Sequence, residues 1–162
     1  MVSRGIHFAL TNSQTEAVLA AQNDAELMSV IEEVEEEWNE EYLAQSDKAW
    51  NAIHRCLTDG SLLYESGQYP LNHCICGGRQ LYNGEDYTVS FVSAVQVKDV
   101  VAALSQINQH WMQERYFTLP QNDYGILCND DFQYIWKWFQ EVRQLYKKAS
   151  IKGRAVIFTV DC

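Results

Sequence analysis

Three side chains in the first half of the chain are of the types that transfer protons in enzymes: Asp47, His54 and His73. Asp47 and His54 are seven residues apart, so one helix through both would place them on the same line. On this interpretation His54 or His73 is the general base, and Asp47 orients the imidazole or acts as the acid. A structural interpretation competes: Asp47 suits the first turn of a helix, and a histidine at a core edge bonds to backbone. The three residues define a candidate polar pocket, because histidine alone is not a motif.

Two cysteines, Cys74 and Cys76, follow His73 and lead into Gly77-Gly78. These glycines would let the backbone approach a ligand closely. A Cys-x-Cys pair on a helix points its sulfurs to different sides, and the sequence lacks the second Cys/His pair of a structural zinc site. We therefore predict buried, unreactive thiols, no metal site and no cofactor. Nucleophile-elbow, phosphate-loop and His-Glu-x-x-His motifs are absent from the sequence, which argues against common hydrolases, NTPases and metalloproteases.

A run of acidic residues is the strongest charge feature of the sequence. It comprises seven glutamates: Glu32, Glu33, Glu35, Glu36, Glu37, Glu40 and Glu41. On a helix, glutamates four residues apart repel each other, by roughly 0.2 to 0.5 kcal/mol for each pair. The segment is either a solvated face or a docking surface for a cationic partner that would relieve the repulsion. Glu33, Glu36, Glu37 and Glu40 are the candidate partner-binding residues, and a metal cage is disfavoured because helical carboxylates without a loop rarely enclose an ion.

Aromatic side chains offer a second kind of binding surface. The predicted last helix carries nine apolar or aromatic residues between 132 and 146, and they cover more than half of its circumference. Core packing on two sides explains this breadth; the alternative is a self-association face or a ligand pocket containing Trp136 and Tyr134. Trp50 lies on the same predicted helix as His54 and would border the polar pocket. Trp50 and Trp136 are therefore candidate binding residues.

The elements that must position these residues follow from periodicity and capping signals. Thr11 with Gln14, and Ser93 with Gln96, form capping boxes, and Ser46 is a plausible N-cap. The predicted helices span 11–21, 24–43, 47–57, 71–76, 93 to about 111, and 131–150. In helix 24–43 the apolar residues recur every three or four positions: Leu27, Ile31, Val34, Trp38 and Tyr42. The segment 117–128 is predicted to be a loop.

The predicted strands span 6–10, 87–92 and 154–160. The last strand is apolar on both faces, so we expect it at the centre of the sheet. Strands mixed with helices in this order predict an α+β fold, with a small mixed or antiparallel sheet and several packed helices. No repeat or linker divides the chain, which favours a single domain over residues 1–162.

Charge and cysteine content restrict the partners and the compartment. The 12 Lys and Arg against 22 Asp and Glu give a net charge of -10, which would repel nucleic acid. The sequence has no apolar run of about 18 residues for a membrane span, and its opening residues lack a secretory pattern. Five irregularly spaced cysteines suit a reducing environment better than a disulfide framework. We expect a cytoplasmic protein without a nucleic-acid or membrane partner.

Several segments resemble the YfbM-like family, a set of small bacterial proteins classed as a domain of unknown function. The matching segments are 4–11, 47–54 with 57–60, and 69–71 leading to 77–78. The resemblance covers about 5–160 and is most specific over 48–60 and 70–78. It implies an α+β fold and a bacterial cytoplasmic setting, and it implies no activity, cofactor or catalytic residue.

The leading functional hypothesis is a non-enzymatic binding or inhibitory protein, of the immunity type, that docks a basic protein partner through the acidic helix face. The alternative is a small enzyme or small-molecule-binding protein that uses the polar pocket around Asp47, His54 and His73. The ligand, the oligomeric state and the strand order do not follow from the sequence.

Overall fold

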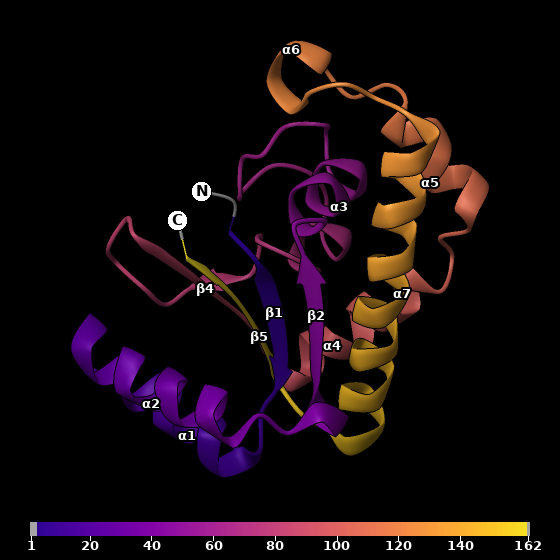
Figure 1. The fold of residues 1–162 in the computed structure, drawn as a ribbon. Helices are drawn as coiled ribbons and strands as arrows, with labels where there is room; N and C mark the ends of the chain where they lie inside the picture. The colour runs from indigo at the N-terminus through magenta and orange to yellow at the C-terminus, as the bar shows by residue number, and fades with distance from the viewer. Residues whose placement is uncertain (1–2, 162) are drawn as a thin grey trace.

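The structure is a computed structural model that describes residues 3–161 (Figure 1). In chain order its elements are β1 (Gly5–Ala9), α1 (Asn12–Ala20), α2 (Asp24–Glu37), the 3-10 helix η1 (Glu40–Tyr42), β2 (Leu43–Asp47), α3 (Trp50–Leu57), the 3-10 helix η2 (Leu71–His73), β3 (Arg79–Gln80), β4 (Tyr87–Val92), α4 (Ala94–Leu104), α5 (Gln109–Tyr116), α6 (Gln121–Tyr124), α7 (Asn129–Lys152) and β5 (Val156–Asp161).

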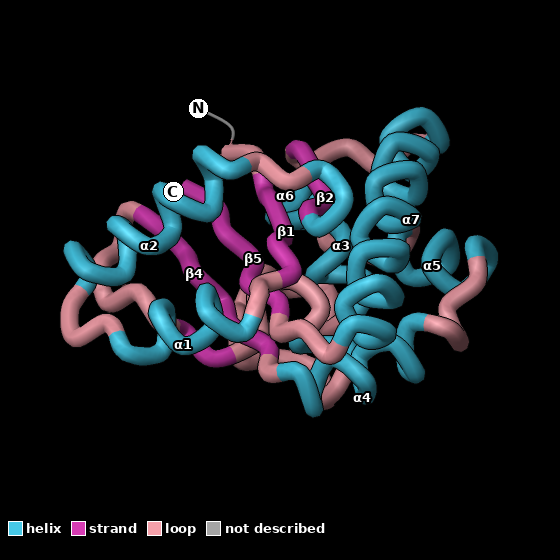
Figure 2. The backbone as a smooth tube through the Cα atoms, turned by 90° about the horizontal axis from the view of Figure 1, so that it is seen from below, coloured by secondary structure: helices cyan, strands magenta, loops and turns pink. Residues whose placement is uncertain are grey.

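The strands form one five-stranded antiparallel sheet in the order β2-β1-β5-β4-β3. Helices α1 and α2 cover one face, and α3, α4 and α7 lie on the other, with α5 packed on the outer side of α3 and α7 (Figure 2). β5 lies in the middle of the sheet, as its apolar composition predicts. Its side chains alternate between the two cores: Val156 and Phe158 face α7, and Ile157 faces α2. The α+β class and the antiparallel alternative for the sheet are both confirmed.

Helix α2 ends at Glu37, so the prediction of a helix to residue 43 is wrong. Trp38 takes a left-handed conformation with φ of 42°, and its N–H bonds to the Val34 carbonyl. The chain then reverses through η1 into β2, which pairs with β1. The four-residue spacing of Trp38 and Tyr42 imitates a helical stripe, but Trp38 packs edge-on against Phe8. Strand pairing outweighs helix propensity here.

The third predicted helix, 47–57, also begins too early. Residues up to Asp47 belong to β2, and α3 starts at Trp50 without a side-chain cap. Ser46, the predicted N-cap, instead donates its hydroxyl to the Gly5 carbonyl at 3.2 Å. Asp47 has a left-handed φ of 46° at the turn between strand and helix. Asp47 and His54 therefore do not share a helix.

The remaining predicted helices are confirmed in part. The capping boxes at Thr11 and Ser93 are confirmed. The predicted helix from 93 to about 111 is two helices, because Asn108 caps α5 through its side chain. The predicted loop 117–128 contains α6, and the predicted helix 71–76 is only the short η2. Within residues 3–161, no helix combines the length and the apolar character that a membrane crossing requires.

Candidate functional site

The predicted acid, Asp47, is held by neighbours from two other parts of the chain. One carboxylate oxygen pairs with the Arg4 Nε at 3.0 Å, and the other accepts the Tyr134 hydroxyl. Tyr134 also accepts the Lys48 N–H at 3.1 Å. These contacts tie the β2–α3 turn to α7, so Asp47 has a structural function at this position.

The two predicted bases, His54 and His73, have different hydrogen-bond partners. His54 is buried, and its Nε2 donates to the Leu63 carbonyl at 3.0 Å. His73 is half-buried, and its Nδ1 lies 2.8 Å from the Asn72 side-chain oxygen. Burial lowers the pKa of both imidazoles. Among residues 3–161, no hydrogen bond or ion pair joins any two of Asp47, His54 and His73.

The Gly77-Gly78 pair faces the protein's own backbone. A Cβ at Gly77 would lie 2.0 Å from the Asn72 carbonyl oxygen, and a Cβ at Gly78 would lie 2.6 Å from that of Phe91. The close approach that the sequence suggests for a ligand is therefore made by neighbouring chain. Cys74 and Cys76 beside it are fully buried as predicted, and burial raises the pKa of the Cys74 thiol. Within residues 3–161, no group of three His, Cys, Asp or Glu side chains could hold a metal ion.

The acidic run gives two short elements rather than one helix face. We call the exposed residues Glu32, Glu33, Glu36 and Glu37 on α2, with Glu40 and Glu41 on η1, the acidic surface. The buried residues Leu27, Ile31 and Val34 hold α2 against the sheet. Glu35 points elsewhere and accepts the Tyr87 hydroxyl at 2.9 Å. The end of α2 at Glu37 removes the helical spacings predicted for Glu36/Glu40 and Glu37/Glu41.

The acidic surface has no ion pair of its own. Among residues 3–161, the ion pairs are Arg4–Asp47, Arg55–Asp123 and His110–Glu114, none of which includes a residue of this surface. The Glu37 carboxylate accepts a hydrogen bond at 3.1 Å from the side-chain amide of Gln14, which carries no charge. The Lys148 Nζ donates to the main-chain carbonyl of Glu41 at 3.3 Å, and not to the Glu41 carboxylate. These carboxylates are therefore exposed, and no cationic side chain within residues 3–161 pairs with them.

The two candidate tryptophans are half-buried and serve the core. Trp50 packs on Phe158 of β5 and donates its indole N–H to the Ser3 carbonyl at 3.0 Å. Trp136 stacks with Phe132 and lies under the Arg143 guanidinium. Helix α7 contacts β2, α4 and α3, which accounts for its broad apolar circumference.

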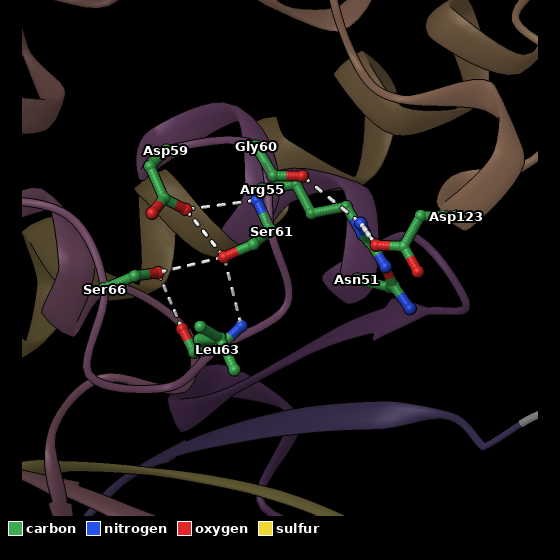
Figure 3. Close-up of polar contacts among 8 residues, drawn as sticks. All are labelled: Asn51, Arg55, Asp59, Gly60, Ser61, Leu63, Ser66 and Asp123. Atoms are coloured by element: carbon green, nitrogen blue, oxygen red, sulfur yellow. Dashed lines mark hydrogen bonds and ion pairs between the residues drawn. The ribbon is translucent and has the colours of Figure 1, made fainter.

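A cavity of about 450 Å³ lies at the C-terminal end of α3, where the sequence reasoning placed no site. Arg55 and Asp59 come from the end of α3 and the turn after it, and Trp111, Glu114 and Arg115 come from α5. Figure 3 shows the loop after α3, with Asp59 bonded to Ser61 and Arg55 reaching Gly60 and Asp123.

The sequence contained one signal of this cavity. Helix α5 carries Trp111 and Arg115 four residues apart, a spacing that brings both side chains to one face. Nothing in the sequence indicates that α5 packs beside the end of α3. The cavity therefore depends on a tertiary contact that local patterns do not encode.

Comparisons with known proteins show the family and the fold. Residues 1–159 match the family model described as a domain of unknown function, DUF1877. The crystal structure of YfbM from Escherichia coli, a protein of unknown function, is similar with a TM-score of 0.71 and 12% identity, covering 97% of this chain and 99% of that one. No curated protein sequence matches. The resemblance to the YfbM-like family is confirmed, and the chain belongs to the DUF1877 family.

Proposed function

We propose that this protein is a non-enzymatic binding protein that docks a basic protein partner through the acidic surface. The observation that carries the proposal is the set of six exposed glutamates, Glu32, Glu33, Glu36, Glu37, Glu40 and Glu41, which form no ion pair within residues 3–161. An inhibitory protein of the immunity type is one form of this function.

The like charges make the surface favour a cation. Glu32/Glu36 and Glu33/Glu37 are four residues apart on α2, so each pair repels by roughly 0.2 to 0.5 kcal/mol on an isolated helix. A partner's Lys or Arg would replace this repulsion with attraction. Because the net charge of the chain is also -10, the field would accelerate the approach of a basic partner at low salt.

A shallow hollow beside the acidic surface supplies a place for one basic side chain. It measures about 180 Å³ and lies between α1 and α2, with Ala17, Val30, Glu33 and Glu37 among its lining residues. The methylene stem of a lysine or arginine can lie along Ala17 and Val30. The charged end of that side chain then meets the carboxylates of Glu33 and Glu37. This combination of apolar and acidic groups favours a basic side chain over a free metal ion.

The test compares two triple variants with equal charge. Changing Glu33, Glu36 and Glu40 to Gln should slow the association of a captured basic partner by about tenfold at about 0.05 M salt, and much less at about 0.5 M. Surface-immobilised protein is exposed to lysate, the bound protein is identified, and its purified form is then measured by association kinetics.

The matched control changes three exposed acidic residues outside this surface, Glu65, Glu85 and Glu141, to Gln. It lowers the net negative charge by the same amount and should keep most of the association rate. Equal association rates for both triple variants would remove the acidic surface from the proposed function.

A further inference from the structure

We infer that the cavity at the end of α3 binds a small zwitterion, an amino acid or dipeptide that carries both a carboxylate and an ammonium group. Its lining places two guanidinium groups, Arg55 and Arg115, with two carboxylates, Asp59 and Glu114. The cavity is open to solvent, and its volume of about 450 Å³ lies within the usual range of small-molecule sites. This site is separate from the acidic surface and does not depend on the proposed partner.

The Arg115 guanidinium is fixed before any ligand arrives. Its Nε donates to the Cys56 carbonyl at 2.8 Å, and one terminal nitrogen donates to the Thr58 carbonyl. The guanidinium carbon Cζ lies over the Trp111 ring, 4.8 Å from its centre. No carboxylate pairs with it, and its Nη1 has no hydrogen-bond partner within residues 3–161. A preorganised donor of this kind suits an oxyanion.

The Arg55 guanidinium supplies a second donor. The residue is only 4% exposed, and its Nε and Nη1 bond to Asn51, Gly60 and Asp123. Its Nη2 has no hydrogen-bond partner within residues 3–161. Among residues 3–161, the only buried side-chain nitrogens or oxygens without a hydrogen bond belong to the histidines, so this Nη2 is not fully enclosed. Since Arg55 lines the cavity, a ligand carboxylate there can accept from it.

The two acidic residues decide the class of ligand. Ser61 donates its hydroxyl at 2.7 Å and its N–H at 3.1 Å to Asp59, and these bonds lower the pKa of the carboxyl. Asp59 therefore stays anionic. Glu114 adds a second carboxylate, 69% exposed, one oxygen of which lies 3.0 Å from the His110 Nε2 while the other is left for a ligand. A phosphate with two charges would meet this repulsion, whereas a ligand ammonium would be attracted. One anionic and one cationic group on the same small molecule match the lining.

The test measures binding of individual amino acids and simple dipeptides by calorimetry. For each compound that binds, two derivatives are compared with it. The N-acetyl derivative lacks the ammonium, and the C-terminal amide lacks the carboxylate. Each derivative should bind at least about tenfold more weakly than the parent compound. Inorganic phosphate should not compete. The inference is overturned if none of the amino acids or dipeptides binds, or if the N-acetyl derivative binds as well as the parent.

Variants locate the site. Glu114→Gln changes an exposed side chain and should weaken the zwitterion about tenfold while leaving its N-acetyl derivative unchanged. Glu141→Gln, on the exposed side of α7, is the matched control and should alter neither. Arg115→Lys keeps the charge but loses the fixed planar group, and should weaken both compounds. Unaltered binding in Glu114→Gln and Arg115→Lys would place the ligand elsewhere and refute the inference.

Discussion

Replacing Gly77 with alanine is expected to lower the free energy of unfolding by about 3 kcal/mol. An alanine Cβ would lie 2.0 Å from the Asn72 carbonyl oxygen and 3.0 Å from that of Tyr64. Both atoms belong to the backbone, so relief requires the segment around η2 to move as a whole. That segment contains the buried Cys74 and Cys76, and a shift would also disturb the core around them. Urea denaturation followed by tryptophan fluorescence measures the loss.

The matched control is Gly153→Ala. Gly153 has a left-handed φ of 66° at the end of α7, and a Cβ there would meet nothing within 4 Å. Its cost is therefore conformational alone, about 1 to 2 kcal/mol. The larger loss for Gly77→Ala would separate steric contact from backbone conformation. If Gly77→Ala is as stable as the unaltered protein, Gly77 does not lie as close to the Asn72 carbonyl as the structure places it.

Local signals predicted the parts of the fold that depend on local physics. The capping boxes at Thr11 and Ser93 satisfy free N–H groups within one turn, so the sequence alone identifies those helix starts. The apolar run of β5 reports burial on both faces, which only a central strand has. β2 was missed because Leu43–Asp47 carries no alternation stronger than the helical spacing before it. Its pairing with β1 is a long-range property.

The candidate site shows the same division. The abundance and exposure of the glutamates follow from composition, but the end of α2 at Glu37 depends on Trp38 packing against Phe8 of β1. Within residues 3–161, no hydrogen bond or ion pair joins the three residues of the predicted pocket, and Asp47 is the last residue of β2 instead of lying on α3. The cavity at the end of α3 is formed together with residues of α5, and no residue spacing in the sequence predicts that α3 and α5 are in contact. The sequence shows which side chains could bind or react, but which of them lie close together follows only from the tertiary structure.

The segment that carries Gly77 is also held by a buried histidine. His7 on β1 is fully buried, and its Nε2 lies 2.8 Å from the Cys74 carbonyl oxygen. A carbonyl only accepts, so Nε2 carries the hydrogen of the neutral ring. Nδ1 then carries none, and it has no hydrogen-bond partner among the described residues 3–161. Tyr146 donates to the same carbonyl at 2.9 Å. Burial lowers the pKa of His7 from 6.5 to about 4.

Acid is therefore expected to weaken the fold as the pH falls below 6.5. Below pH 6.5 the unfolded chain protonates this histidine while the folded chain does not until about pH 4, so stability falls as the pH decreases through this window. The loss attributable to His7 should be about 2 kcal/mol between pH 8 and pH 5.

Substituting His7 with Gln, which retains a donor for Cys74, should reduce this pH dependence by about 2 kcal/mol when unfolding free energies are compared at pH 8 and pH 5. His54, whose pKa burial also lowers, accounts for part of what is left. His110→Gln is the matched control: its side chain is 78% exposed and its ion pair with Glu114 lies at the surface, so this substitution should change the pH dependence much less than His7→Gln does. An equal pH dependence in His7→Gln and the unaltered chain would show that His7 does not have a lowered pKa. The protonation of one central imidazole would then have no part in the acid response, and the link between β1 and the Cys74 segment would be independent of pH.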